Sequence, residues 1–183
     1  MSVDLVATVG SASANAFADV DYADAYLEGR GNATAWSGAT EDVKSVALVD
    51  ASRELSALES LLQGYRTDAT QALAFPRTLV INTKAPLYST IGVTGYPEFA
   101  DDIVPVDWKN ATCELALEFL RAGTTDVASL DRNAGVIEKT LGPIRTVWAE
   151  PTARASGLAR FPRVLGLVEQ FLAARSGVDI VRC

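Results

Sequence analysis

Histidine is absent from this sequence of 183 residues, and cysteine occurs only twice. Without histidine the chain lacks the commonest general base and the commonest metal ligand of proteins. A Ser/His/Asp or Cys/His nucleophile arrangement is therefore excluded, and a zinc site would need four ligands of other kinds. Cys113 lies in a helical pattern, where a buried thiol is the simplest interpretation, and no disulfide with Cys183 is expected.

Glycine-rich phosphate loops are also lacking, because the chain has neither a GxxxxGK[ST] motif nor a GxGxxG motif after a predicted strand. Paired carboxylates occur at Glu41/Asp42 and Asp101/Asp102. Adjacent side chains point in different directions, however, and the first pair suits the N-terminus of a helix. A magnesium-dependent hydrolase or nuclease that uses Asp101 and Asp102 is the least favoured of three functional interpretations. We expect no enzymatic activity, no cofactor and no metal.

Long apolar runs are missing as well: no window approaches the roughly 18 apolar residues of a membrane span. The first residues include Asp4 and lack the basic and apolar regions of a signal peptide. We therefore expect a protein of cytosolic origin with no membrane partner.

Charge is distributed unevenly along the chain, whose net charge is −7. Residues 1–142 hold 10 Lys/Arg and 20 Asp/Glu, whereas residues 143–183 hold six Arg and three acids. This asymmetry suggests that the two parts face different partners. Arginines of the late part, together with Phe161, could contact phosphate, and an acidic protein partner would explain them equally well; they are Arg145, Arg154, Arg160, Arg163 and Arg175.

Capping residues and apolar stripes predict four helices. Asp19 caps a helix over residues 20–30. Thr40 precedes a stripe that predicts about six helical turns, through Leu62. Pro105 suits the first turn of a helix that Gly123 ends. Pro162 opens a final helix, which closes before Gly177.

The predicted fold class is α+β, mainly α: a small helical bundle with a β-hairpin and a long loop or extended excursion. Residues 1–18 are predicted to be an extended N-terminal arm, with a short strand at residues 15–17. Residues 19–176 form a single helical domain, and residues 177–183 a C-terminal tail. The hairpin covers residues 136–149 around Gly142-Pro143.

The long loop spans residues 78–104, with a possible strand at Leu79–Ile81. A loop of this length is uncommon without a function. It either reaches over a neighbouring subunit or is a surface insertion. The candidate oligomer or partner contacts are Tyr88 and Tyr96 in this loop, Leu141, Gly142 and Pro143 in the hairpin, and Arg154, Arg160, Arg163 and Arg182 in the C-terminal part.

Four motifs, in order over about 130 residues, resemble those of one family of tailed-phage proteins. Residues 15–26 (NAFADVDYADAY) resemble its SYV-x-x-x-EADAYF opening. Trp36 and residues 71–77 (QALAFPR) resemble its W…QALAWPR core. Residues 104–116 resemble its IP…ATCELAL helix, and residues 137–144 (IEKTLGPI) its EKVGP-x-x-V hairpin. The segment from Leu79 to Ile103 is longer than the family usually carries, and residues 150–160 match none of its motifs.

This family, often labelled DnaT-like single-stranded-DNA-binding, is similar to head-tail connector (adaptor) proteins. The resemblance implies a structural protein of the virion neck, assembled in the bacterial host cytoplasm. The implied partners are identical subunits in a ring (expected to be a dodecamer), the portal protein, tail or neck completion proteins, and genomic double-stranded DNA that passes through the lumen without specific binding.

The alternative function is a single-stranded-DNA-binding replication accessory. DNA-binding proteins gain affinity when their lysines and arginines release counterions from phosphates. An acidic body loses that contribution, whereas an acidic lumen would keep a duplex from adhering to the wall of a conduit. The charge of the chain therefore favours the adaptor, with the arginine-rich C-terminal part as a candidate portal-docking element.

Overall fold

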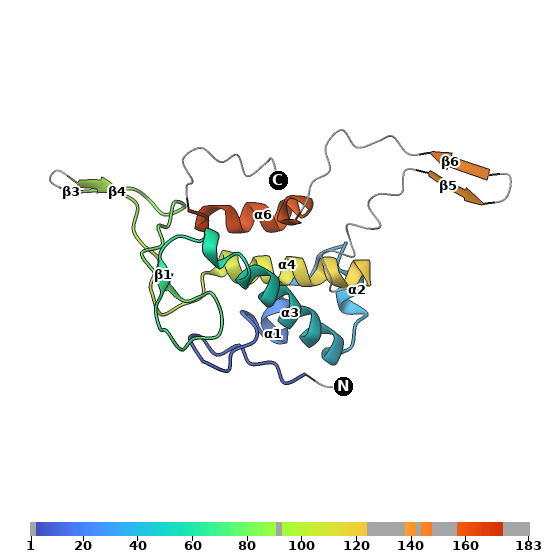
Figure 1. Cartoon of the computed structure of the whole chain (residues 1–183), viewed down its shortest axis with the longest axis horizontal. Coiled ribbons are helices and arrows are strands. Elements are labelled where there is room, and N and C mark those ends of the chain that lie inside the picture. Colours follow the sequence, from blue (N-terminus) through green and yellow to red (C-terminus); the bar gives the residue numbers. More distant parts are fainter. Residues whose placement is uncertain (1–2, 91–92, 124–137, 142–143, 148–156, 174–183) are drawn as a thin grey trace.

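The computed structural model describes residues 3–90, 93–123, 138–141, 144–147 and 157–173. Their architecture is mainly helical with small antiparallel β-hairpins, which confirms the predicted α+β, mainly α class. The helices are α1 (Val20–Leu27), α2 (Thr34–Ser37), α3 (Glu41–Ser56), α4 (Val106–Ala122) and α6 (Pro162–Val168). Figure 1 shows α4 running through the middle of the molecule, where it contacts the four other helices.

Helix α4 is central because it is apolar around most of its circumference. Its buried residues run without a break from Ala111 to Leu117, with Trp108 and Phe119 on either side. Pro105 is the N-cap rather than the first helical residue, and Gly123 ends the helix in the left-handed conformation (φ 66°). A helix buried on nearly every side belongs in the core of a bundle.

An aromatic cluster fills the space between α4 and the segments around it. Phe75 and Phe171 each pack against Trp108, Phe17 meets Trp108 edge-on at 5.8 Å, and Phe99 lies 5.4 Å from Phe171, all measured between ring centroids. Edge-on and tilted pairs of this kind add stabilisation beyond their buried area. Phe17 belongs to the predicted N-terminal arm, so this segment contributes to the core.

Residues 15–17 form no strand, although one was predicted there. Instead the Asn15 side chain fixes the segment locally: its Oδ1 accepts from the Val6 amide at 2.7 Å, and its Nδ2 donates to the Asp4 carbonyl at 2.8 Å. An asparagine side chain that satisfies backbone groups in this way competes with strand pairing.

Three helices are shorter than predicted. Helix α1 ends at Leu27 rather than at residue 30, because Gly29 adopts a left-handed conformation (φ 72°). Helix α3 ends at Ser56 and is followed by the 3₁₀ turn η1 (Glu59–Leu61), while α6 ends at Val168 and is followed by η3 (Glu169–Phe171). Beyond these turns the two segments pair with each other. The Gln63 amide donates to the Phe171 carbonyl, and the Ala173 amide donates to the Leu61 carbonyl, both at 2.8 Å. Pairing of two distant segments thus replaces the last helical turns.

Among the described residues of 65–104, the excursion between η1 and α4 contains no helix, as predicted, and it is built from two short antiparallel strand pairs. Strand β1 (Tyr65–Arg66) pairs with β2 (Arg77–Thr78), and β3 (Tyr88–Thr90) pairs with β4 (Val93–Gly95). The strand predicted at Leu79–Ile81 is wrong in position, because Leu79 adopts a left-handed conformation (φ 60°) that interrupts the extended chain. Figure 1 shows β3 and β4 projecting from the helical body.

The predicted hairpin near Gly142-Pro143 is confirmed by strands β5 (Glu138–Leu141) and β6 (Ile144–Val147), which pair antiparallel with Leu141 opposite Ile144. The η2 turn (Gly157–Arg160) precedes α6. Within the described part of the chain, no helix is both long and apolar enough to cross a bilayer.

Candidate functional site: an exposed apolar surface and an arginine cleft

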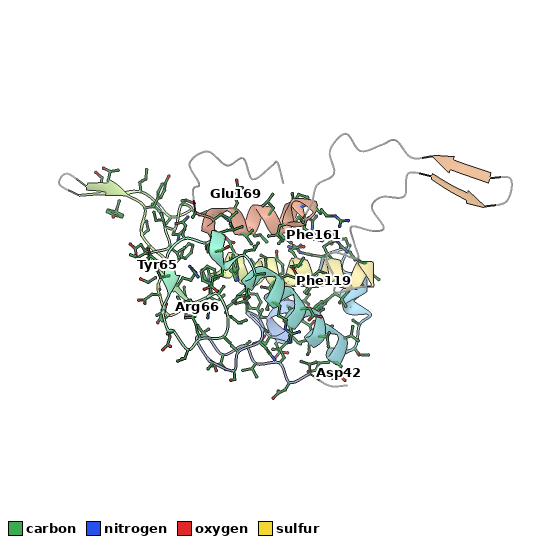
Figure 2. All side chains as sticks on the ribbon, viewed as in Figure 1. Asp42, Tyr65, Arg66, Phe119, Phe161 and Glu169 are labelled. Carbon is green, nitrogen blue, oxygen red and sulfur yellow. The ribbon has the colours of Figure 1, made fainter. Side chains whose placement is uncertain are left out.

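Large apolar side chains are exposed mainly on one part of the molecule. Of the ten that are exposed in the described chain, eight lie between residues 65 and 106. We call these eight the excursion surface: Tyr65, Leu79, Ile81, Leu87, Tyr88, Tyr96, Ile103 and Val106. Figure 2 shows Tyr65, the most exposed at 70%, at the end of the molecule that carries β1. Concentrated apolar exposure of this kind marks interaction sites.

Backbone pairing holds the excursion surface in a fixed shape. Val80 is fully buried, and its carbonyl accepts from the Phe99 amide at 2.8 Å. Ile81, on the other side of the chain, is 44% exposed and forms an isolated bridge with Glu98. A segment that is apolar on both faces is typical of a strand covered on both sides. Here the outer face is exposed in the isolated chain.

A charged network supports the base of this surface. The Arg66 guanidinium donates to both carboxylate oxygens of Glu59, at 2.5 and 2.6 Å, and buried Arg77 approaches the same carboxylate at 3.5 Å. Hydrogen bonding from Arg66 holds the pKa of Glu59 below its ordinary value. Arg77 also donates to the carbonyls of Gln63 and Gly64, at 2.8 and 2.7 Å. Arg77, the arginine that ends the QALAFPR motif, therefore has a structural role.

Three exposed carboxylates, which we call the acidic edge, border the excursion surface: Glu98, Asp101 and Asp102. None of them forms an ion pair within the described residues. The edge is anchored, because the Thr67 hydroxyl donates to the Asp101 carbonyl at 2.7 Å. Among the described residues no group of three His, Cys, Asp or Glu could hold a metal ion, so the geometry gives the carboxylates no metal site.

A second feature, the arginine cleft, lies between α1, the C-terminal part of α4 and the start of α6. It consists of two adjoining hollows of about 620 and 470 Å³ that share Glu114, Pro162 and Arg163. Its charged and aromatic lining residues are Tyr26, Arg30, Glu114, Glu118, Arg121, Arg160, Phe161 and Arg163. Phe161, one of these residues, is labelled in Figure 2 beside the start of α6.

Buried Glu114 organises the floor of the cleft. Its Oε1 accepts from the Tyr26 hydroxyl at 3.0 Å and from the Arg30 guanidinium, which also lies 4.5 Å from the Tyr26 ring centroid. Burial and the neighbouring Glu114 carboxylate raise the pKa of Tyr26 to about 12. The phenol therefore remains protonated and a hydrogen-bond donor at any physiological pH.

Most cations of the described chain already face a carboxylate. Ion pairs are formed by Arg30, Lys44, Arg53, Arg66, Arg77, Lys84 and Arg121. Arg163 differs, since it is exposed on α6 and forms no ion pair within the described residues. Arg163 of the arginine cleft and the three carboxylates of the acidic edge thus lie on different surfaces.

The sequence-predicted contact residues divide between these features. Tyr88 and Tyr96 belong to the excursion surface at 45% and 40% exposure, while Arg160 and Arg163 line the arginine cleft. Leu141 ends β5. Four of the predicted residues lie outside the described part of the chain: Gly142, Pro143, Arg154 and Arg182.

Sequence reasoning missed the other members of both surfaces. Leu79, Ile81 and Leu87 carried a signal, because they are apolar residues in a segment with no helical period. Arg30 and Arg121 carried none: Arg30 follows α1 and Arg121 lies in the last turn of α4, and only the packing of α1 on α4 brings them to one cleft.

One family matches almost the entire chain. The family described as "Putative DnaT-like ssDNA binding protein" covers residues 3–183. No match was found among curated proteins or solved structures.

Proposed function

This chain belongs to the DnaT-like ssDNA-binding protein family, and from that premise we propose that it is a non-enzymatic, ring-forming head-to-tail adaptor of a tailed-phage virion. The proposed ring, expected to be a dodecamer, sits between the portal and the tail, contacts both, and lets the genome pass. Four motifs that resemble those of phage neck proteins support this proposal. So does the net charge of −7, which suits a conduit for DNA.

The observation that carries the proposal is the excursion surface with its acidic edge. Its eight exposed apolar side chains favour contact with another protein. The adjacent carboxylates of Glu98, Asp101 and Asp102 would repel a phosphate backbone. A surface with both properties is better matched to a subunit interface than to a nucleic acid.

Native mass spectrometry of the purified protein, alone and with its portal ring, tests the proposal. We expect a defined number of copies bound to each portal ring. The protein is included without portal as well, because a free adaptor can be monomeric before it docks. A protein that remains monomeric and indifferent to portal would contradict the proposal.

The second candidate function is single-stranded-DNA binding, and the description of the family supports it more directly than it supports an adaptor. The arginine cleft is the region that would serve it, because arginines there lie beside the rings of Tyr26 and Phe161. Cationic grooves with stacking aromatics bind single strands. Against this, Arg30 and Arg121 are already neutralised by Glu114 and Glu118.

Fluorescence anisotropy with a labelled oligothymidine separates the two functions. Binding is measured at about 50 and 200 mM salt, since phosphate contacts weaken steeply over this range. The adaptor predicts no submicromolar binding. Salt-sensitive submicromolar binding that Arg163→Glu abolishes, and that the charge-matched Arg53→Glu on α3 preserves, would establish the second function in its place.

A further inference from the structure

We propose that neighbouring copies of this chain join head to tail, with the acidic edge and excursion surface of one copy entering the arginine cleft of the next. This inference rests on the proposed ring and names the two surfaces that would build it. It commits to one occupant of the cleft, a second copy of the same chain.

Charge complementarity is the first argument. The acidic edge presents Glu98, Asp101 and Asp102 to solvent without a cation within the described chain. The arginine cleft presents Arg163, which has no carboxylate partner there, beside Arg160. Seven other cations of the described chain, Arg30 and Arg121 of the cleft among them, are paired internally. The surplus of each sign would be neutralised by contact between the two surfaces.

The apolar groups of the two surfaces also complement one another. The residues beside the acidic edge, Tyr96 and Ile103, are 40% and 43% exposed. The arginine cleft is lined by the apolar side chains of Phe161, Pro162 and Leu167 between its arginines. An interface with apolar groups at its centre and charges around them has the composition of specific protein–protein contacts.

Position along α4 gives the third argument. The acidic edge precedes the N-terminus of α4 at Val106, whereas Arg121 of the arginine cleft lies in its last turn. Figure 2 shows Tyr65 at one side of the helical body, and Phe119 and Phe161 toward its other side. Two different, complementary patches on opposite ends make a heterologous contact, which closes into a ring when the rotation between copies permits. A two-fold contact of the acidic edge with itself would oppose like charges.

Charge reversal on each surface, followed by mixing, tests this arrangement. One variant carries Asp101→Arg and Asp102→Arg, and the other carries Arg160→Glu and Arg163→Glu. Each variant alone brings like charges together, so we expect at least a tenfold loss of self-association by sedimentation velocity and of subunits held on the portal ring. In an equimolar mixture, each contact between the two different variants pairs opposite charges, so we expect assembly to return with the two variants in alternation.

The control variant carries Glu41→Arg and Asp42→Arg, a matched charge change at the start of α3, and should assemble as the native chain does. Circular dichroism melting checks that each variant folds, and Asp101→Asn with Asp102→Asn provides a milder change that should weaken assembly partially. Reversed variants that assemble normally, or a mixture of folded variants that fails to recover, would overturn the head-to-tail contact while the ring itself stands. A native chain that never assembles, with or without portal, would remove the proposed function and this inference together.

Discussion

Phe75 packs against Trp108 with their ring centroids 4.7 Å apart, and this contact joins the QALAFPR segment to the first turn of α4. Both side chains are at least 98% buried, and Phe171 closes the group at 5.5 Å from each ring. The two motifs that stood out in the sequence therefore meet in the core, where they support the excursion rather than form its outer surface.

Removal of the Phe75 ring should destabilise the fold. Phe75→Ala leaves a cavity beside Trp108, and we expect a loss of about 3–5 kcal/mol in the free energy of unfolding. Urea denaturation followed by tryptophan fluorescence measures it. Tyr65→Ala, at a side chain 70% exposed, is the control and should change stability by no more than about 0.5 kcal/mol. Equal effects at the two positions would be inconsistent with the aromatic core described above.

Gly64 should tolerate no side chain. Its φ is 66°, and an added Cβ would lie 1.9 Å from the Thr78 carbonyl oxygen. Gly64→Ala should therefore cost more than about 3 kcal/mol, because β1 and β2 must separate. Gly29, with φ 72° and nothing within 4 Å of such a Cβ, is the matched control. Gly29→Ala should cost only the roughly 1–2 kcal/mol of the left-handed conformation. Thermal unfolding of both variants compares them.

Acid should weaken the fold partly through Glu59. Because Arg66 lowers its pKa in the folded state below the ordinary value of 4.5, the unfolded chain binds more protons in that range. The stabilisation is fully present above pH 4.5 and is lost as the pH falls through the folded-state pKa. Glu59→Gln should flatten the fall of unfolding free energy with acid, measured by denaturation at a series of pH values. An unchanged pH slope would refute the role of the Arg66 pair.

Cys113 should be inert toward thiol reagents. Burial raises its pKa to about 12, so the thiol stays protonated at pH 8. In a Cys183→Ser variant, a disulfide reagent should react only as urea unfolds the chain. The Cys113→Ser variant reports on the remaining thiol under the same conditions. Complete modification of Cys113 within minutes in native buffer would show that α4 is more accessible than its burial implies.

Local patterns in the sequence predicted the helical fold class, the hairpin of β5 and β6, and the extent of α4, because these depend on periodicity and capping over a few residues. Helices α3 and α6 were predicted to extend too far. Gln63 pairs with Phe171, which lies more than one hundred residues away, and a local pattern gives no sign of this pairing. Leu79 is a second case in which the local sequence pattern did not predict the backbone. Its left-handed backbone carries no sequence signal comparable to a glycine, and it displaces the predicted strand.

Only those parts of the candidate site that depend on neighbouring residues in the sequence could be predicted. Tyr88 and Tyr96 were identified because they stand in a long loop, and Arg160 and Arg163 because they belong to an arginine-rich stretch. The arginine cleft as a whole was not predictable. Arg30 lies in the connection after α1, Glu114 on α4 and Arg163 on α6, and only tertiary packing assembles them.

Helix α4 has a mechanical consequence for any assembly built on its two ends. At about 1.5 Å per residue, its 17 residues form a rod of roughly 25 Å, which separates the segment of the acidic edge, before its first residue, from Arg121 of the arginine cleft in its last turn. A buried α-helix resists stretching far better than a loop. The distance between the contacts that one subunit makes with its two neighbours would therefore stay constant. The curvature of a closed ring, and with it the bore available to DNA, would then depend on the length of one helix.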